Sequence, residues 1–190
     1  MKQIIIGLVG PIASGKGILA SHLEKLGFNY QSLSDRVREE AKLRHKELTR
    51  ENLQNIGDEL RSQFGNQILA ERTAKLLADY AGNIVIDSIR NPGEISFLQK
   101  AFDIVVIGID APVKARLGWY LERSHSRGED GTTPEDFFRA NARDLGVAGD
   151  SSGQQVNQCL KMSDVVIQNT GSKQELIDKI DALIANHFKQ

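Results

Sequence analysis

Short runs of apolar residues, separated by stretches with a helical pattern, organise this chain. The runs lie at residues 4–9, 84–86, 104–109 and 165–167, and a weaker run lies at residues 28–33. The first four do not alternate apolar with polar residues, so each predicts a strand buried on both faces, as in a parallel sheet covered by helices. Strands alternating with helices in this way predict an α/β fold with a three-layer, doubly wound, five-stranded parallel sheet.

Capping signals mark where several helices begin. Two segments, residues 91–94 and 133–136, each combine a capping side chain, a proline and acidic residues of the first turn. Thr49 precedes a segment whose apolar residues recur every three or four positions: Leu53, Ile56, Leu60 and Phe64. Ser172 and Glu175 predict the start of the last helix, whose expected buried residues are Ile177, Ile180 and Ile184.

Some segments look less like core. Residues 35–51 are dense in charge and poor in large apolar residues, which predicts a helical arm facing solvent. Residues 124–133 and 146–158 are rich in Gly, Ser and Asp and flank a short helix, which is typical of a moving flap. We therefore expect one domain over residues 1–190, with an acceptor-binding arm at about 35–66 and a mobile lid at about 123–158.

The charge balance narrows the class of partner. The 190 residues include 24 Lys and Arg against 25 Asp and Glu, a formal net charge of −1. This balance argues against a protein built to hold nucleic acid or an anionic membrane surface. A single cysteine, Cys159, cannot form an internal disulfide, and the first apolar run is too short to span a membrane. We expect a cytoplasmic protein with small-molecule partners, neither nucleic acid nor membrane.

The sequence GPIASGKG at residues 10–17 is the most specific motif. Glycines let the backbone curl so that successive N–H groups point at phosphate oxygens, and a helix N-terminus adds partial positive charge. Lys16 follows at the spacing G-x-x-x-x-G-K of the Walker A loop, whereas Gly17 replaces the Ser or Thr that would hold Mg²⁺. The alternative is a glycine-containing turn between a strand and a helix.

This loop resembles that of the adenylate kinases, which also reads G-K-G. The resemblance implies a P-loop kinase fold, ATP as co-substrate and Mg²⁺ as cofactor. One departure is Ile18, where those enzymes carry Thr. The ATP-binding residues expected from the match are Gly10, Ala13, Ser14, Gly15, Lys16, Gly17 and Ile18.

Two segments predict the site of the phosphoryl acceptor. Residues 32–38 resemble the S-x-G-D-x-x-R element of nucleoside monophosphate kinases, which implies that Arg38 binds the acceptor's phosphate beside an orienting Asp35. A charged helix start, with Asp35 at the positive end of the helix dipole, is the alternative. Asp87 follows a buried strand, where ligands bind in open α/β sheets, and could act on Mg²⁺ through water or on the acceptor as a base. Arg90 is placed to pair with an acceptor phosphate, although a strand-ending Asp can also cap a turn.

Arginines cluster on one side of a predicted helix at residues 112–127. Arg116, Tyr120, Arg123 and Arg127 share a face, and an apolar stripe at Val113, Leu117 and Leu121 lies on another. Such a cluster suits a lid that closes guanidinium groups onto the transferring phosphoryl, so Arg123 and Arg127 join Lys16 and Asp87 as catalytic candidates. Arg139 and Arg143 contribute to this lid or form solvated ion pairs.

The segment SDVVIQNTGS at residues 163–172 resembles a stretch of the dephospho-CoA kinases. On that resemblance Asn169 and Gly171 lie on the adenine side of the nucleotide, whereas a capped strand-to-helix turn explains the Gly and Ser equally well. Residues 32–35 lack the I-D-A-D setting of those kinases. Residues 50–72 and 153–159 also resemble the kinase-like domain preceding some deoxycytidylate-type deaminases, but no H-x-E with P-C-x-x-C occurs.

Together these motifs predict an ATP- and Mg²⁺-dependent phosphotransferase that acts on a nucleotide. The expected nucleotide is either a nucleoside monophosphate or a deoxynucleoside monophosphate. Dephospho-CoA kinase is the alternative among enzymes. A nucleotide-sensing module without turnover is the alternative from another class, because positions 17 and 18 leave no loop hydroxyl to order a metal.

Overall fold

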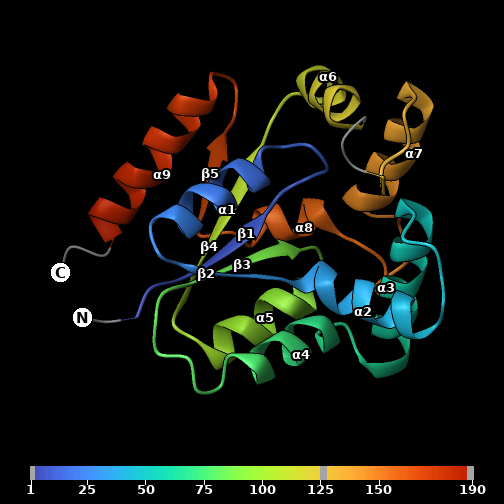
Figure 1. The fold of residues 1–190 in the computed structure, drawn as a ribbon, viewed down its shortest axis with the longest axis horizontal. Coiled ribbons are helices and arrows are strands. Elements are labelled where there is room, and N and C mark those ends of the chain that lie inside the picture. The colour runs from blue at the N-terminus through green and yellow to red at the C-terminus, as the bar shows by residue number, and fades with distance from the viewer. Residues whose placement is uncertain (1–2, 125–127, 188–190) are drawn as a thin grey trace.

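Five strands and nine helices form the part of the chain that this computed structural model describes, residues 3–124 and 128–187 (Figure 1). The strands are β1 (Ile5–Val9), β2 (Asn29–Ser32), β3 (Ile84–Ile89), β4 (Ile104–Asp110) and β5 (Val165–Gln168). The helices are α1 (Lys16–Lys25), α2 (Leu33–Leu43), α3 (Arg50–Phe64), α4 (Ile68–Leu76), α5 (Pro92–Ala101), α6 (Val113–Ser124), α7 (Pro134–Leu145), α8 (Val156–Lys161) and α9 (Lys173–His187).

The sheet is parallel throughout, with strand order β2-β3-β1-β4-β5, which confirms the predicted fold class. The largest boundary difference lies in β3, which continues through Asp87 to Ile89 after the register with β1 shifts. Chain segments leave β1 and β4 toward opposite edges of the sheet. The carboxyl ends of these two neighbouring strands therefore form the crevice where open α/β sheets bind ligands.

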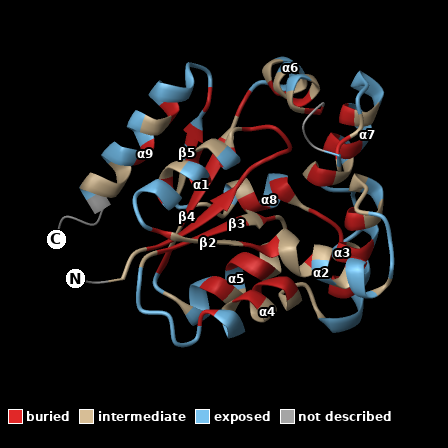
Figure 2. Cartoon of the chain, in the orientation of Figure 1, coloured by how far each residue is buried: buried red, intermediate tan, exposed pale blue. Residues whose placement is uncertain are grey.

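Helices cover both faces of the sheet, and the central strands β3, β1 and β4 are almost entirely buried (Figure 2). The edge strands are less buried, and β5 is not buried on both faces as expected. One apolar cluster joins α1 and α9 to one face through Leu19, Leu23 and Ile180. A larger cluster covers the other face with α4, α5 and α8, and extends to α2 and α3. These two clusters make the three layers that the sequence predicts.

The segment expected to face solvent as an arm is only partly exposed. In α2 the residues Leu33, Val37 and Ala41 are buried in the larger core cluster, and charged side chains occupy most of the other positions. Because the buried residues recur at intervals of four, they form a narrow apolar stripe. Because the segment is dense in charged residues, this stripe was not recognised in the sequence, and the burial of α2 was not predicted.

A third cluster joins α6 and α7 to the loop after β1. It contains Ile12, Ala13, Tyr120, Phe137 and Ala140. The orientation of α6 differs from what an apolar stripe would suggest, because the buried residues of this helix are Arg116, Tyr120 and Ser124. Val113 is 44% exposed, so the arginine-bearing face of α6 is the one that packs inward.

Hydrogen bonds from the loop after β3 hold the Gly- and Ser-rich segment between α7 and α8. The Asn91 amide donates to the carbonyl oxygens of Ser151 and Gly153, each at 3.0 Å. The Gln155 N–H donates to the Arg90 carbonyl at 2.7 Å. These contacts bring the region predicted as a flap against the expected acceptor residue Arg90.

The predicted caps are confirmed at four helices. Thr49 accepts a hydrogen bond from the Asn52 N–H, and reciprocal capping boxes begin α5 and α7. Ser172 and Glu175 exchange hydrogen bonds before α9. One detail of apolar burial was wrong: α9 buries Leu176 and the expected Ile180 most deeply, rather than Ile177 and Ile184.

Arg61 and Glu94 form a buried ion pair between α3 and α5, and replacing Glu94 should destabilise the fold. Their side chains are 2% and 0% exposed, and the Arg61 Nη2 lies 2.9 Å from Glu94 Oε1. Glu94→Gln leaves the Arg61 charge without this partner, which we expect to lower the free energy of unfolding by about 3–5 kcal/mol. Urea denaturation measures this change.

The matched control is Glu71→Gln, which removes the exposed pair between Glu71 and Lys75 in α4. We expect this variant to change the free energy of unfolding by less than about 0.5 kcal/mol. Equal effects in the two variants would contradict the assignment of Arg61–Glu94 as a structural pair.

Candidate functional site

The loop between β1 and α1 has the backbone geometry of a phosphate-binding turn. Gly10 and Gly15 have φ angles of 155° and 107° and Ala13 has a φ of 61°, all in the left-handed half of the map. A Cβ on Gly10 would lie 2.2 Å from the Ile109 carbonyl oxygen, and one on Gly15 would lie 2.6 Å from Asn169 Nδ2. Both positions therefore require glycine for space as well as for conformation.

The N-terminus of α1 is open toward this loop. Its N-cap is Gly15, and no side chain among the described residues caps the helix. The first N–H groups of a helix lack intrahelical acceptors and carry partial positive charge, so they can bind an anion. The buried hydroxyl of Ser14 also has no hydrogen-bond partner among the described residues. The loop thus presents unused donors in the place where a phosphate would bind.

Lys16, the first residue of α1, folds back over the loop. Its ammonium group donates to the carbonyl oxygens of Gly10 at 2.5 Å and Pro11 at 3.0 Å. Burial lowers the pKa of Lys16 to about 8, although the Asp87 carboxylate acts in the opposite direction. An added phosphate would supply the negative charge that this buried ammonium group needs.

Asp87 lies on the same side of the sheet as α1. Val85, two residues earlier in β3, belongs to the core cluster with α1, and alternate strand residues share a face. The Asp87 carboxylate accepts hydrogen bonds from the Ser88 N–H at 2.5 Å and from the Tyr30 hydroxyl at 3.2 Å. Burial, followed by the charge of Asp87, raises the pKa of Tyr30, so this hydroxyl stays a proton donor.

Asp87 fits a metal held mainly by nucleotide phosphates. Mg²⁺ commonly binds one or two carboxylates, with phosphate oxygens and water completing its octahedron. Among the described residues no group of three or more His, Cys, Asp or Glu forms a metal site of its own. Gly17 offers no hydroxyl, so contact through water from Asp87 is the interaction that these residues support.

Asp144 in α7 connects the loop to Arg90, and the sequence analysis missed it. Its Oδ2 accepts from the Ile12 N–H at 2.7 Å, and its Oδ1 pairs with the Arg90 guanidinium. Burial acts to lower the pKa of Arg90, but the carboxylates of Asp144 and Asp87 raise it overall. The available signal was Asp144 three positions after Asn141, which places both residues on one face of α7.

Arg116 contacts the carbonyl group of the same loop residue, Ile12. Its guanidinium donates to the Ile12 carbonyl at 3.1 Å and to Asn141 Oδ1 at 2.6 Å, and its Nε donates to the Ala111 carbonyl at 3.0 Å. The Arg116 side chain is therefore committed to positioning the loop, unlike the phosphoryl-contacting role considered for this arginine face. Burial lowers its pKa.

A second cluster of charges lies where α2 and α3 face the segment after α6. Arg38 binds the Glu129 carboxylate through Nε at 2.6 Å and Nη2 at 3.0 Å, and also pairs with Asp35 at 2.8 Å. Arg50 and Arg123 both contact the Asp130 carboxylate, at 2.5 Å and 3.1 Å. The hydrogen bonds that Arg38 donates to Glu129 raise the pKa of Arg38.

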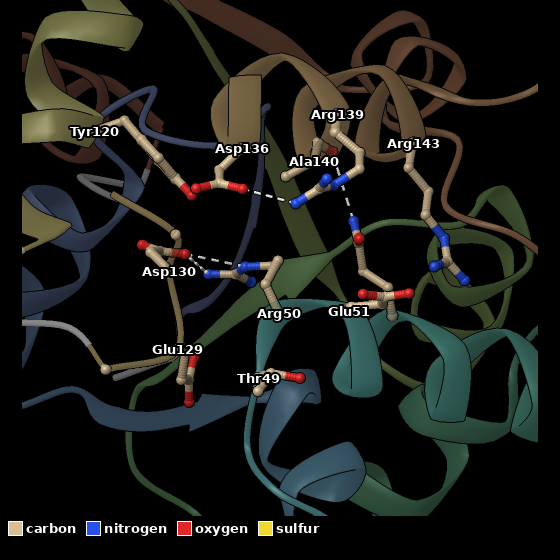
Figure 3. A pocket seen from close by; sticks show the side chains of 13 residues that line it. Thr49, Arg50, Glu51, Tyr120, Glu129, Asp130, Asp136, Arg139, Ala140 and Arg143 are labelled. Atoms are coloured by element: carbon tan, nitrogen blue, oxygen red, sulfur yellow. Dashed lines mark hydrogen bonds and ion pairs between the residues drawn. The ribbon is translucent and has the colours of Figure 1, made fainter. Parts of the chain in front are cut away.

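Two cavities meet at this cluster. A cavity of about 340 Å³ is lined by residues of α3, α6 and α7 and by the segment with Glu129 and Asp130 (Figure 3). A smaller one, of about 20 Å³, is lined by Arg38, Arg90 and Ser88. Arg50 and Gln54 line both cavities. Neither Arg50 nor Gln54 was identified from the sequence, because each lies inside an ordinary helical pattern.

The structure groups several of the predicted residues. The pKa of Lys16 is influenced by three of them, Asp87, Arg90 and Arg123, so they lie near its ammonium group. Arg38 lines the same cavity as Arg90. Asn169 is buried, and its amide donates to the Ser14 carbonyl at 2.9 Å, so the side chain supports the loop. Gly171 is exposed in the turn before α9.

The remaining lid candidates lie apart from the loop or outside the description. Arg139 is exposed and pairs with Asp136, and Arg143 pairs with Asp58 and Asn55. Arg127 lies outside the described residues. Trp119 packs partly buried against the third core cluster, as expected for a structural aromatic residue.

The parallel sheet, the phosphate loop after its first strand and the arginines around that loop define a P-loop kinase-like protein. The chain belongs to the AAA domain family, whose model matches residues 9–137, and to the UPF0200 proteins. It is 33% identical over 147 residues to the UPF0200 protein of Hyperthermus butylicus, covering 76% of this chain and 77% of that protein. Identity to the Thermococcus gammatolerans UPF0200 protein is 31% over 194 residues, covering 97% and 94%.

A UPF0200/UPF0201 protein of Archaeoglobus fulgidus is 32% identical over 190 residues, and this chain spans 56% of that protein's length. Among solved structures, TT1252 from Thermus thermophilus superposes with a TM-score of 0.62 at 22% identity, over 98% of this chain and 99% of that one. Shikimate kinase from Aquifex aeolicus superposes with a TM-score of 0.55 at 15% identity, over 98% and 100%. These two likenesses show a shared fold.

No helix in the described part of the chain is long and apolar enough to cross a membrane.

The buried Lys16 predicts a specific dependence of stability on pH. Its folded-state pKa is about 8, below the usual lysine value near 10.4, so between these values the unfolded chain binds more protons. Stability from this residue therefore rises with pH in that window. From pH 7 to 9.5, the free energy of unfolding of wild type relative to Lys16→Met should rise on the order of 1–2 kcal/mol.

Urea denaturation at several pH values measures this difference. Lys25→Met, which removes an exposed lysine at the other end of α1, serves as the control and should show no such trend relative to wild type. A flat difference between wild type and Lys16→Met across the range would refute the proposed burial of the ammonium group.

Proposed function

We propose that this protein transfers the γ-phosphoryl group of ATP to the phosphate of a nucleotide. The acceptor is either a nucleoside monophosphate or a deoxynucleoside monophosphate. The observation that carries the proposal is the pairing of Arg38 with a carboxylate through two nitrogens, beside the cavity that Arg38 shares with Arg90. A guanidinium fork that binds a carboxylate in this way also matches phosphate. An anion-binding site thus lies next to the phosphate loop.

In this proposal the loop and the arginines act by position and charge. The loop amides and Lys16 bind the β- and γ-phosphates of ATP, and Arg38 and Arg90 orient the acceptor's phosphate beside Asp35. An acceptor phosphate oxygen forms the new bond to the γ-phosphorus, the bond to the β,γ-bridging oxygen breaks, and ADP leaves with that electron pair. Arg123, together with Arg127, balances charge on the transferred group.

Mg²⁺ would be held by the nucleotide phosphates and, through water, by Asp87, and it would supply further positive charge to the phosphoryl oxygens. Tyr30 and the Ser88 N–H fix the Asp87 carboxylate for that role. The proposal also assigns Asn169 and Gly171 to the adenine side of the nucleotide. In support, the Asn169 amide holds the phosphate loop through the Ser14 carbonyl. A phosphate oxygen that is already ionised needs no general base, so Asp87 can remain a carboxylate throughout.

Dephospho-CoA kinase is the second candidate, favoured by the segment at residues 163–172, which contains the loop-supporting Asn169. Its acceptor is a hydroxyl, so Asp87 would also have to accept a proton. A sensing module is the candidate of another class, and it differs from both enzymes by binding ATP without turnover.

One assay separates these functions: release of ADP from ATP and Mg²⁺, screened against nucleoside monophosphates, deoxynucleoside monophosphates and dephospho-CoA. We expect one monophosphate to raise ADP release well above background, and Lys16→Ala to abolish the increase. Silence with every acceptor, while calorimetry still detects ATP binding, would reject the kinase and favour the sensing module.

Replacing Arg38 should weaken the binding of the acceptor far more than the binding of ATP. Arg38→Met removes a charge-assisted hydrogen-bonding group worth about 1.5–3 kcal/mol, so KM for the acceptor should rise roughly 10–100-fold. The KM for ATP should stay within about twofold, because Arg38 lies in the acceptor cavity. Steady-state kinetics with each substrate varied in turn measures both constants.

Arg44→Met is the matched control, since Arg44 ends the same helix and pairs with Glu40 and Glu59 near the surface. It should leave both KM values unchanged. An unaltered acceptor KM in Arg38→Met, or an equal rise in the KM for ATP, would show that Arg38 does not bind the acceptor.

A further inference from the structure

The segment between α6 and α7 places two acidic side chains among the arginines of the acceptor site. The Glu129 carboxylate lies in the fork of Arg38, and the Asp130 carboxylate lies between Arg50 and Arg123 (Figure 3 shows Arg50 and Asp130). The Asp130 side chain is 0% exposed and that of Glu129 is 19% exposed. This segment is also hydrogen-bonded to α3, because the Arg50 N–H donates to the Glu129 carbonyl at 2.8 Å.

The same arginines connect this acidic pair to the reaction centre. Arg50 lines both the 340 Å³ cavity, with Glu129 and Asp130, and the smaller cavity, with Arg38 and Arg90. The smaller cavity has a volume of about 20 Å³, close to that of one water molecule, so a phosphate group does not fit it in this arrangement. A phosphate approaching Arg38 would meet the Glu129 carboxylate on the fork of that arginine.

We propose that Glu129 and Asp130 occupy the binding site of the acceptor's phosphate. A phosphomonoester then binds Arg38 and Arg50 by displacing the two carboxylates. The identification of this anion as the acceptor rests on the proposed function. A carboxylate and a phosphate use the same guanidinium geometry, so the two compete for one site. The phosphate carries more charge than either carboxylate, which favours the exchange.

The surroundings of the pair allow such an exchange. Glycines at positions 128 and 131 flank the two acids. The chain is open before them, because a side chain at Gly128 would meet nothing within 4 Å, whereas a Cβ at Gly131 would lie 2.3 Å from Asp136 Cγ. Arg38, Arg50 and Arg123 keep 25%, 15% and 29% of their side chains exposed, so solvent and ligand reach them. Because a neutral acceptor cannot replace two carboxylates on arginine, the pair also selects for an anionic acceptor.

The experiment measures binding of ribose 5-phosphate, a phosphomonoester without a base, by titration calorimetry. The full-length chain carries Lys16→Ala in every sample, so that the phosphate loop binds the probe weakly. We expect Glu129→Gln with Asp130→Asn to bind ribose 5-phosphate roughly tenfold more tightly than the parent, about the effect of one charge-assisted hydrogen bond. Ribose, the neutral probe, should bind neither protein measurably.

Glu135→Gln is the matched control, because Glu135 is an exposed acid in the first turn of α7. It should leave the affinity unchanged. Equal or weaker binding in the double variant would overturn the proposal, since it would mean that the acids position the arginines or that the probe binds elsewhere. If the double variant does not fold, Glu129→Gln alone decides by the same criterion, because Glu129 is less buried than Asp130.

This titration needs no turnover. A protein that releases no ADP with any acceptor can still bind ribose 5-phosphate more tightly without the acidic pair. Failure of the proposed kinase function and failure of the displacement proposal are therefore distinguished.

Discussion

The backbone of Ile12 is the part of the structure on which the arrangement of the site depends. Its N–H donates to Asp144 and its carbonyl accepts from Arg116, while the Ile12 side chain belongs to the apolar cluster of α6 and α7. Asp144 also pairs with Arg90, next to the end of β3. The phosphate loop, the helices that cover it and an arginine of the proposed acceptor site are therefore held together by a few buried polar contacts, which become stronger as water is excluded.

These contacts leave a site that is prepared for negative charge. The ammonium group of Lys16 is buried against backbone carbonyls with a lowered pKa, and the N-terminus of α1 has no side-chain cap among the described residues. At the proposed acceptor site, Glu129 of the chain itself neutralises Arg38. Donors that are fixed before the ligand arrives need no reorganisation during phosphoryl transfer, which is how such a site would accelerate the reaction.

Sequence periodicity and local motifs were sufficient to predict the fold and the phosphate loop between β1 and α1. Buried parallel strands read as continuous apolar runs, and a phosphate loop depends on neighbouring residues, so both signals are local. Charged residues that pack inward were harder to predict. Arg116 is buried because its guanidinium reaches a carbonyl and an amide that are distant in the sequence, and α2 buries an apolar stripe among many charged residues. Asp144, Arg50 and Glu129 gain their roles from long-range pairs that no motif encodes.

The most direct test of the central claim follows the phosphoryl group itself. The protein is incubated with ATP labelled with ³²P at the γ-position, Mg²⁺ and pooled nucleoside and deoxynucleoside monophosphates, and the products are separated by chromatography. The proposed function predicts that the label moves to a nucleoside diphosphate in wild type and remains in ATP with Lys16→Ala. Label found only in ATP or in inorganic phosphate would contradict transfer to a nucleotide acceptor.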